Sequence, residues 1–492
     1  MKPKLNIVWL KRDLRLQDHR PLAEAENDKL DYIIIYIFEP SALRYPDSSL
    51  RHQQFVYHSI RDLNQQLKPY KREVFIFYAE AIAVFSYLLE FFNIQQLFSY
   101  QESGIRKTWE RDKAVDILLK ANNIQWNEYA KDGVLRGIKN RESWDAAWYK
   151  YMSQNSIINN YSNTILPDLE NPFPIPKKLE DQLLTYPDLY QKPGEHFAWL
   201  YLKSFCDERG KNYSKHISKP LESRKSGGRI SPHLAWGNIS ARQAYQFIKN
   251  HPNYTSNKRS FEGMLTRLKW RSHFIQKFEV ECDYETRCVN RGYEDMQHTN
   301  DMRLIEAWKN GETGFPLVDA CMRCLQHTGW INFRMRAMLV SVFCHHFDCD
   351  WRKGVYHLAN LFLDYEPGIH FTQFQMQAGT TGVNLIRMYN PIKQSKDHDP
   401  NGIFIKQWVN ELSDVPTEFI HEPWKMTALD KAFNGLTINY PNPIVNLEKT
   451  GKSAKEKIWR QRADALVKSE SQRIIKTHTR NKRTRNNQKL KS

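Results

Sequence analysis

The placement of short apolar runs constrains the fold more than any other feature of the chain. Four runs in the first 130 residues, KLNIVWL, YIIIYIF, EVFIFY and QQLFSY, have the composition of buried strands. Residues 51–67 and 81–92 lie between these runs and have helical spacing. Strand-sized runs that alternate with helices are typical of a parallel sheet covered by helices. We therefore predict a doubly wound α/β domain over residues 1–130.

A different pattern begins near residue 191. Between about 191 and 450 the apolar spacing is helical and β-branched alternation is scarce, which predicts an all-α second domain. Residues 131–190 have a polar sequence rich in Asn and Pro, which predicts a long connection between the two domains. Residues 451–492 begin as a basic helix and become low in complexity after about 478. We expect this basic tail to fray.

The charge of the chain points to acidic partners. The net charge is +17, and residues 451–492 carry 14 Lys or Arg against 3 Asp or Glu. A basic balance favours nucleic acid as a partner. A basic tail alone is equally consistent with a solvated, disordered end.

Apolar runs and cysteines indicate a cytoplasmic protein. The chain has no stretch of about 18 apolar residues, and Lys11 and Arg12 interrupt the first run too early for a signal peptide. Seven scattered cysteines favour a reducing compartment. Cys321 and Cys324 form a C-x-x-C pair within a helical, apolar pattern. That setting favours buried thiols, so no metal site and no membrane association are predicted.

Two basic segments have the composition of ligand sites. The segment SRKSGGRISPH (223–233) combines paired glycines with a helix start at Ser231, which suits an anion but also a flexible turn before a capped helix. In RLKWRSHFIQKF (267–278), Trp270 is either part of the core or an aromatic platform for a base. The GxGxxG turn that follows the first strand in nicotinamide dehydrogenases is absent from this sequence, which argues against that class of enzyme.

Residues 310–404 bring arginines, carboxylates and aromatic residues into one region. Arg334 and Arg336 are two apart on a predicted helix and so point about 200° apart. An arginine that faces inward requires a carboxylate or a phosphate, because a buried unpaired charge is costly. Asp364 and Glu366 are the candidate carboxylates, and a structural ion pair is the simplest interpretation.

Taken in order, these segments resemble the photolyase/cryptochrome flavoprotein family, as a divergent bacterial-type member. VWLKRDLRLQDHRPL is similar to the family's first strand and loop, and WKNGETGFPLVDACMRCLQHTGW matches its flavin-domain signature. DWRKG, GTTG, RMYNP and FIKQWVNEL follow in the family's order, so the resemblance extends to about residue 450. It implies a monomer with an N-terminal antenna-type domain and a helical FAD-binding domain. A second chromophore of the pterin or deazaflavin/flavin type is also implied, near YQESGIRKTWERD (100–112).

The resemblance implies a set of FAD-binding residues. The phosphates would be held by Tyr213, Gly227, Gly228, Arg229, Ile230 and Ser231. The family usually has hydroxyl side chains at the two glycine positions, so backbone amides would replace them here. Arg271, Asn332 and Arg336 would line the flavin, with Asp364 paired to Arg336 and Glu366 near the N3 edge.

His370 and the electron-supply positions depart from the family's pattern. His370 lies where repair enzymes usually have Asn beside flavin N5, and we expect it to change protonation near neutral pH. Of the family's three electron-supplying tryptophans, only Trp351 is matched. The flavin-proximal position is Phe374, which is hard to oxidise, and the surface position falls near His298. Trp330, Trp308 and Tyr389 are alternative donors.

The implied DNA-binding set also departs from the family. It consists of Arg267, Trp270, Arg334, Met376 and Arg387, with Trp270 stacked on a flipped-out lesion. Arg267 stands where dimer-repair enzymes have Glu, and Met376 replaces a second stacking Trp. Asn332 and Phe333 replace the His-His pair of (6-4) enzymes. The resemblance implies Trp270, Trp351 and His370 as the catalytic residues. Three functions are consistent with the sequence.

The first is a deoxyribodipyrimidine photolyase, a light-dependent lyase that repairs cyclobutane dimers in UV-damaged DNA, duplex or single-stranded. Such an enzyme would associate with the nucleoid in a bacterium. The second is a cryptochrome-like photoreceptor that binds FAD without repair. The third is a nucleic-acid-binding helical protein without photochemistry, in which the tryptophans only fill the core.

Overall fold

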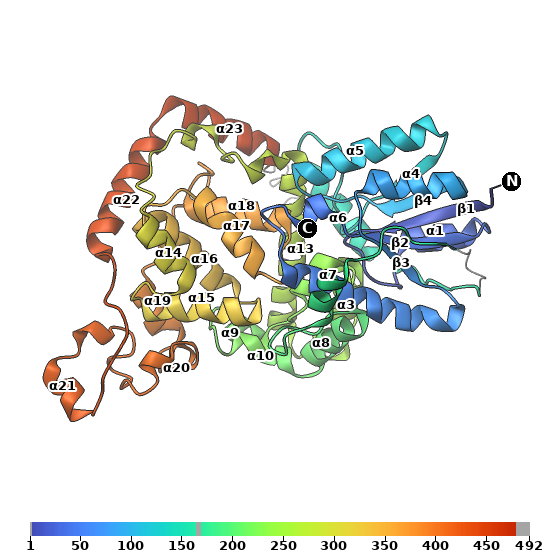
Figure 1. The fold of residues 1–492 in the computed structure, drawn as a ribbon. Helices are drawn as coiled ribbons and strands as arrows, with labels where there is room; N and C mark the ends of the chain where they lie inside the picture. The colour runs from blue at the N-terminus through green and yellow to red at the C-terminus, as the bar shows by residue number, and fades with distance from the viewer. Residues whose placement is uncertain (1, 164–168, 479–492) are drawn as a thin grey trace.

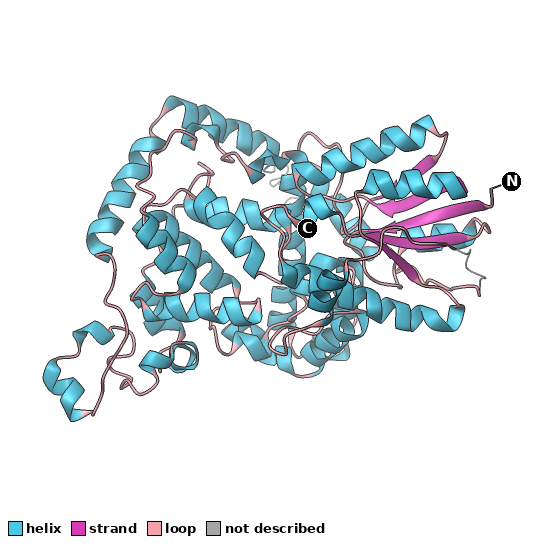
Figure 2. Ribbon diagram, in the orientation of Figure 1, coloured by secondary structure: helices cyan, strands magenta, loops and turns pink. Residues whose placement is uncertain are grey.

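Five strands form one parallel sheet at one end of the protein, and helices make up the remainder (Figures 1 and 2). The computed structural model describes residues 2–163 and 169–478. The strands are β1 (Lys4–Leu10), β2 (Tyr32–Ile37), β3 (Val74–Phe77), β4 (Asn93–Tyr100) and β5 (Gln125–Tyr129). Their order is β3-β2-β1-β4-β5, so the chain builds outward from β1 in both directions. This is the predicted doubly wound topology.

The alternation of side chains along the strands explains why both faces of the sheet are covered. Ile7 and Trp9 of β1 face one layer, and Val8 and Leu10 face the other. Helices α1 (Arg20–Asn27) and α3 (Leu50–Leu67) cover the Val8 face. Helices α4 (Ala81–Phe91) and α5 (Arg106–Ala121) cover the Trp9 face. The sheet is therefore buried on both sides, as the continuous apolar runs predict.

Strand β5 is absent from the sequence-based prediction. Its sequence, QWNEY, is polar, and its residues are only partly buried. It lies at the edge of the sheet, where it pairs with β4 from Gln96↔Gln125 to Tyr100↔Tyr129. An edge strand needs no apolar run, so pairing with β4 decides its conformation.

The segment between residues 131 and 190 contains two helices, α6 (Trp144–Ser153) and α7 (Lys177–Leu184). Trp144 and Trp148 of α6 are fully buried in a core that they share with helices of the C-terminal region. Helix α7 packs on α3, and Leu183 is buried there. The segment thus contributes to the packing of both regions.

The C-terminal region is helical, and no strand occurs among the described residues after Tyr129. Its longer helices are α8 (Glu195–Asp207), α12 (Ala241–Lys249), α13 (Lys258–Val280), α14 (Met302–Asn310), α15 (Pro316–Thr328), α16 (Phe333–Ser341), α17 (Arg352–Leu361) and α18 (Pro367–Ala378). Its shorter helices are α9 (Tyr213–His216), α10 (Ser223–Ser226), α11 (Ser231–Trp236), α19 (Pro391–His398), α20 (Ile403–Trp408) and α21 (Ala428–Phe433), whereas α2 (Pro40–Leu43) belongs to the sheet domain. Helix α18 packs against both α13 and α16.

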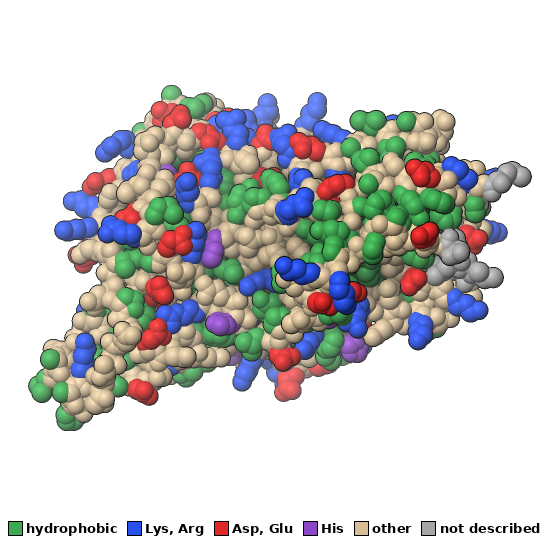
Figure 3. All heavy atoms as spheres, in the orientation of Figure 1, with side chains coloured by type: hydrophobic (Ala, Val, Ile, Leu, Met, Phe, Trp, Pro, Cys, Tyr) green, Lys and Arg blue, Asp and Glu red, His purple; other side chains and the backbone are tan. Residues whose placement is uncertain are grey.

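Two helices end the described chain, α22 (Leu447–Arg462) and α23 (Ala465–His478). Part of their positive charge is neutralised within the protein, because Lys457 pairs with Asp348 and Arg473 pairs with Glu281. Figure 3 shows Lys and Arg side chains mixed with Asp and Glu along the edge that these helices form. The part of the predicted tail beyond residue 478 lies outside the described residues.

All seven cysteines are free thiols, and six of them are buried. Within residues 2–163 and 169–478, no group of three metal-binding side chains is arranged around a common point. No helix in the same ranges combines the length and apolar composition needed to cross a membrane.

Candidate functional site: a deep cavity in the helical region

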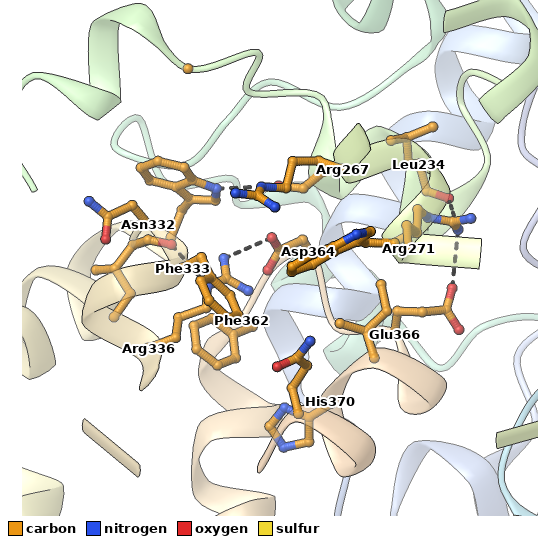
Figure 4. Close-up of a pocket in the computed structure, with 18 of the residues that line it drawn as sticks. Leu234, Arg267, Arg271, Asn332, Phe333, Arg336, Phe362, Asp364, Glu366 and His370 are labelled. Atoms are coloured by element: carbon orange, nitrogen blue, oxygen red, sulfur yellow. Dashed lines mark hydrogen bonds and ion pairs between the residues drawn. The ribbon is translucent and has the colours of Figure 1, made fainter. Parts of the chain in front are cut away.

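Helices α13, α16 and α18 and the 227–231 turn enclose a cavity of about 310 Å³ (Figure 4). Its volume is within the range of sites for small molecules and cofactors. The walls are mostly apolar, and a few charged side chains point inward from different elements. All twelve residues that the sequence predicts to bind FAD line this cavity: Tyr213, Gly227, Gly228, Arg229, Ile230, Ser231, Arg271, Asn332, Arg336, Asp364, Glu366 and His370.

One wall is built around the ion pair between Arg336 and Asp364. Arg336 Nη2 lies 2.8 Å from Asp364 Oδ2, which confirms the predicted pairing. Arg336 also donates from Nε to the Ile331 carbonyl at 2.9 Å and packs over the Phe362 ring at 4.0 Å. The second oxygen of Asp364, Oδ1, is buried and has no hydrogen-bond partner among the described residues. A buried acceptor of this kind is normally satisfied, so it suits a donor on a bound ligand.

On the opposite wall, Arg271 donates hydrogen bonds to three acceptors within the protein. Arg271 donates to the Leu234 carbonyl at 2.8 Å and to Glu366 Oε2 at 3.3 Å (Figure 4). It also donates to Asp132 Oδ2 at 2.8 Å. Asp132 was missed by sequence reasoning, because it follows the sheet and is 139 residues from Arg271 in the chain. These contacts use most of the guanidinium, so Arg271 shapes the wall and neutralises Glu366.

The end of the cavity near α10 carries the positive charges of Arg224 and Arg229. Arg229 stacks on the Trp330 ring at 4.1 Å and donates to Gln191 Oε1 at 3.0 Å. Arg224 donates to the Trp330 carbonyl at 3.0 Å, and neither arginine has an ion pair with any described residue. Burial, together with the charge of Arg224, lowers the pKa of Arg229 to about 9. This arrangement favours binding of an anion such as a phosphate.

Gly227 is required at this end by close packing. A Cβ at position 227 would lie 2.6 Å from the Ser223 carbonyl oxygen, which is backbone and cannot move aside. At Gly228 a Cβ would meet only the flexible end of Met264, at 2.8 Å. The loss of the family's hydroxyl side chains at these positions therefore has a steric cause at 227 but not at 228.

Asn332 lines the cavity, but its polar atoms are used within the protein. Its side-chain oxygen accepts from the Met335 N–H at 3.0 Å and caps α16, and its amide donates to Ser223 Oγ at 3.0 Å. An N-cap of this type stabilises a helix by about 1 kcal/mol. The cap is therefore a sufficient structural reason for Asn at this position.

The structure contradicts one expectation for His370. Its ring lines the cavity, and Nε2 hydrogen-bonds to the Val355 carbonyl at 2.8 Å. Burial lowers the pKa of His370 to about 4. The ring is therefore neutral at physiological pH, and the predicted change of protonation near neutral pH is wrong.

Sequence reasoning missed two amide side chains, Gln373 and Gln377, on the cavity face of α18. Gln373 Oε1 and both polar atoms of Gln377 are buried without a hydrogen-bond partner among the described residues. With His370 and Phe374 they repeat at positions i, i+3, i+4 and i+7, so helical periodicity could have identified them. These amides can pair with a heterocycle that has both donors and acceptors.

Trp270 lies at the mouth of the cavity and is 46% exposed. This exposure excludes the core-packing interpretation of Trp270. The Arg267 guanidinium stacks on its ring at 4.7 Å. The mouth therefore presents an aromatic face and a positive charge to solvent.

Four other predicted residues do not line the cavity. Trp351 is buried behind it, with the Arg352 guanidinium 4.9 Å from its ring. Arg334 donates to the Tyr389 hydroxyl at 3.3 Å, Met376 is partly exposed, and Arg387 is exposed.

A second, smaller cavity of about 130 Å³ lies at the carboxyl ends of β1 and β2. Residues that follow β4 also line this cavity, so it reaches the switch point of the sheet between β1 and β4, where open α/β folds commonly bind ligands. Its charged side chains are largely paired with one another, because Arg111 contacts Glu39 at 3.1 Å and Glu102 at 2.7 Å. Part of the 100–112 segment, which the resemblance assigns to an antenna chromophore, lines this cavity.

The fold and the two cavities define a class of protein with a doubly wound sheet domain and a helical cofactor domain. Residues 6–144 match the family described as DNA photolyase, and residues 264–460 match the FAD binding domain of DNA photolyase. The chain is 28% identical over 476 residues to a deoxyribodipyrimidine photo-lyase of Alkalihalophilus pseudofirmus, covering 92% of this chain and 97% of that protein. It is 25% identical over 495 residues to a cryptochrome DASH of Synechocystis, covering 91% and 96%.

Solved structures share the whole fold. A bacterial class III photolyase from Agrobacterium tumefaciens has a TM-score of 0.82 at 23% identity, covering 94% of this chain and 99% of that one. An archaeal photolyase from Sulfolobus tokodaii with two FAD molecules has a TM-score of 0.78 at 26% identity, covering 93% and 100%. The chain belongs to the photolyase/cryptochrome family.

Proposed function

We propose that this chain is a photolyase that repairs pyrimidine dimers in DNA with FAD and blue light, with cyclobutane dimers as its substrate. The observation that carries the proposal is the exposed Trp270, stacked with Arg267, at the mouth of a cavity whose unsatisfied groups fit FAD. Curated relatives named deoxyribodipyrimidine photo-lyase support the same activity.

The cavity residues fit FAD at both ends. Arg229, with Arg224 beside it, would bind its phosphates, because these partly buried cations have no ion pair with any described residue. The free Asp364 oxygen and the amides of Gln373 and Gln377 would pair with the polar edge of the flavin. The reduced flavin supplies a light-excited electron to the lesion, and the protein contributes no nucleophile.

The mouth residues would position the substrate. Trp270 offers a stacking face to a lesion that has left the duplex, and such a platform contributes about 1–3 kcal/mol per base. Extracting a dimer costs less than extracting a paired base. Arg267 would place positive charge beside the lesion, and the exposed Arg387 would contact phosphates.

Illumination of the reduced protein with a thymine-dimer oligonucleotide tests this proposal. We expect loss of dimers in blue light but not in the dark. Trp270→Ala should abolish most of the repair and weaken binding of the damaged oligonucleotide. Trp459→Ala is the matched control, because Trp459 is 62% exposed on α22 and does not line the cavity. A flavin-bound protein that leaves the dimers intact would refute the repair function.

A cryptochrome-like photoreceptor is the second candidate. Arg267, Phe374 and Met376 depart from the repair enzymes at the substrate and electron-supply positions. A solved Synechocystis cryptochrome also shares the fold, with a TM-score of 0.81. Bound flavin that responds to blue light, combined with no loss of any dimer type, would select this function.

We also propose that the smaller cavity binds an antenna chromophore. Its position at the switch point of the sheet supports binding of a ligand. Absorbance of the purified protein beyond that of one flavin per chain is the expected result. A spectrum fully accounted for by one FAD would contradict it.

A further inference from the structure

We propose that Tyr365 supplies an electron to the light-excited flavin while its phenolic proton passes to Asp47. The inference rests on the proposed function, because it requires FAD in the large cavity. It addresses the position occupied by Phe374, which lines the cavity and cannot easily be oxidised.

Tyr365 lies directly behind the cavity wall. Its neighbours in the chain, Asp364 and Glu366, both line the cavity, whereas Tyr365 is 2% exposed and lines the smaller cavity. The Tyr365 ring contacts the His370 ring, with the two centroids 5.4 Å apart. His370 lines the cavity itself, so a single ring separates Tyr365 from the space assigned to the flavin.

The hydroxyl of Tyr365 is held by a carboxylate from the sheet domain. Tyr365 Oη donates to Asp47 Oδ2 at 2.7 Å, and Asp47 is buried in the loop between α2 and α3. This distance is suitable for direct transfer of a proton from the phenol to the carboxylate. An oxidised phenol is a strong acid, so an adjacent base makes the ring easier to oxidise.

The remaining contacts fix the ring in place. His52 stacks on Tyr365 with the centroids 5.7 Å apart and the planes at 17°. Arg12 donates to the Tyr365 carbonyl at 2.9 Å, and its guanidinium lies 5.7 Å from the ring. The pKa values of His52 and His370 are lowered by burial to about 3 and about 4, so both rings are neutral at pH 7.

The step is balanced in electrons and protons. Tyr365 loses one electron to the excited, oxidised flavin, and its O–H bond breaks as the proton moves to Asp47 Oδ2. The products are a neutral tyrosyl radical, a protonated Asp47 and a flavin reduced by one electron. An external thiolate then returns one electron to Tyr365 and becomes a thiyl radical, while Asp47 returns the proton.

The burial of Asp47 and the charges around it determine how the proposed proton transfer depends on pH. Tyr365 donates to it, Arg12 beside it favours the carboxylate, and Glu285 disfavours it. Burial is the largest effect and raises the pKa of Asp47 to about 6. Most Asp47 is therefore ionised above pH 6, and below pH 6 the ionised fraction decreases about tenfold per pH unit. The yield of the tyrosyl radical should fall in the same way.

Electron paramagnetic resonance of the flavin-loaded protein, illuminated with its flavin oxidised, tests the proposal. We expect a tyrosyl radical whose spectrum changes when tyrosine is ring-deuterated and not when tryptophan is. Tyr365→Phe should lower the radical yield by about tenfold or more, and so should Asp47→Asn. Tyr356→Phe is the matched control, because Tyr356 also donates to a carboxylate, Glu285, at 3.2 Å, but its ring contacts Tyr45 and Phe371, which do not line the cavity.

A spectrum that responds only to tryptophan labelling would overturn the proposal, as would an undiminished tyrosyl radical in Tyr365→Phe. The labelling experiment uses the unchanged protein, so it decides the question even if a variant fails to fold. A purified protein without flavin would refute the proposed function. A flavin that is photoreduced through another residue would refute only this inference.

Discussion

Replacing Arg229 with methionine should have opposite effects on the free protein and on cofactor binding. Burial and the charge of Arg224 lower the pKa of Arg229 from 12.5 to about 9. At about 1.4 kcal/mol per pKa unit, the charged form is disfavoured in the folded protein by about 5 kcal/mol. Loss of the Trp330 stacking costs about 1 kcal/mol, and loss of the Gln191 hydrogen bond costs about 1–2 kcal/mol. The flavin-free variant should therefore be more stable by about 2–3 kcal/mol, although it binds FAD more weakly.

Arg271→Met is the matched control, because Arg271 lines the same cavity but is paired. Its removal would leave Asp132 and Glu366 as buried unpaired carboxylates and should cost about 3–5 kcal/mol. Urea unfolding of the flavin-free proteins measures stability, and fluorescence titration measures the affinity for FAD. If Arg229→Met destabilises the flavin-free protein as much as Arg271→Met, Arg229 is not an anion-binding residue. The same conclusion follows if Arg229→Met leaves the affinity for FAD unchanged.

Two further predictions concern pH. Burial raises the pKa of Glu195 from 4.5 to about 7, so between these values the unfolded chain loses a proton that the folded protein keeps. The free energy of unfolding should then decrease by about 3 kcal/mol as the pH rises from 4.5 to 7, and the decrease should disappear in Glu195→Gln when both proteins are unfolded in urea. Because the pKa of His370 is about 4, flavin reoxidation should keep the same pH profile between pH 5 and 8 in His370→Asn; a transition near neutral pH that the variant removes would contradict this.

The main elements of the fold were predictable because their signals are local. Buried parallel strands need continuous apolar runs, and four such runs correspond to β1 to β4. Helical spacing likewise predicted α3 and α4 within one residue at each end. Strand β5 carries no such signal, because an edge strand with a polar sequence is held by its neighbour.

The residues predicted to bind FAD could be placed at one cavity from the sequence, through the resemblance to the family. What those residues do depends on their neighbours in space. The sequence places Asn332 at the cavity, but only the structure shows that its oxygen caps α16. The protonation of His370 likewise depends on burial, which no residue type reveals by itself.

The sequence by itself determined the two-domain architecture, the family and the location of the cavity, because apolar periodicity and short motifs are properties of neighbouring residues. Only the tertiary structure decided the electrostatics. The absence of an acidic partner for Arg229 among the described residues and the contact of Tyr365 with Asp47 both depend on long-range packing. Tyr365 and Asp47 are 318 residues apart, and they meet because the helical region packs against the carboxyl ends of the sheet. Such contacts depend on how the two regions pack together, so local sequence patterns do not predict them.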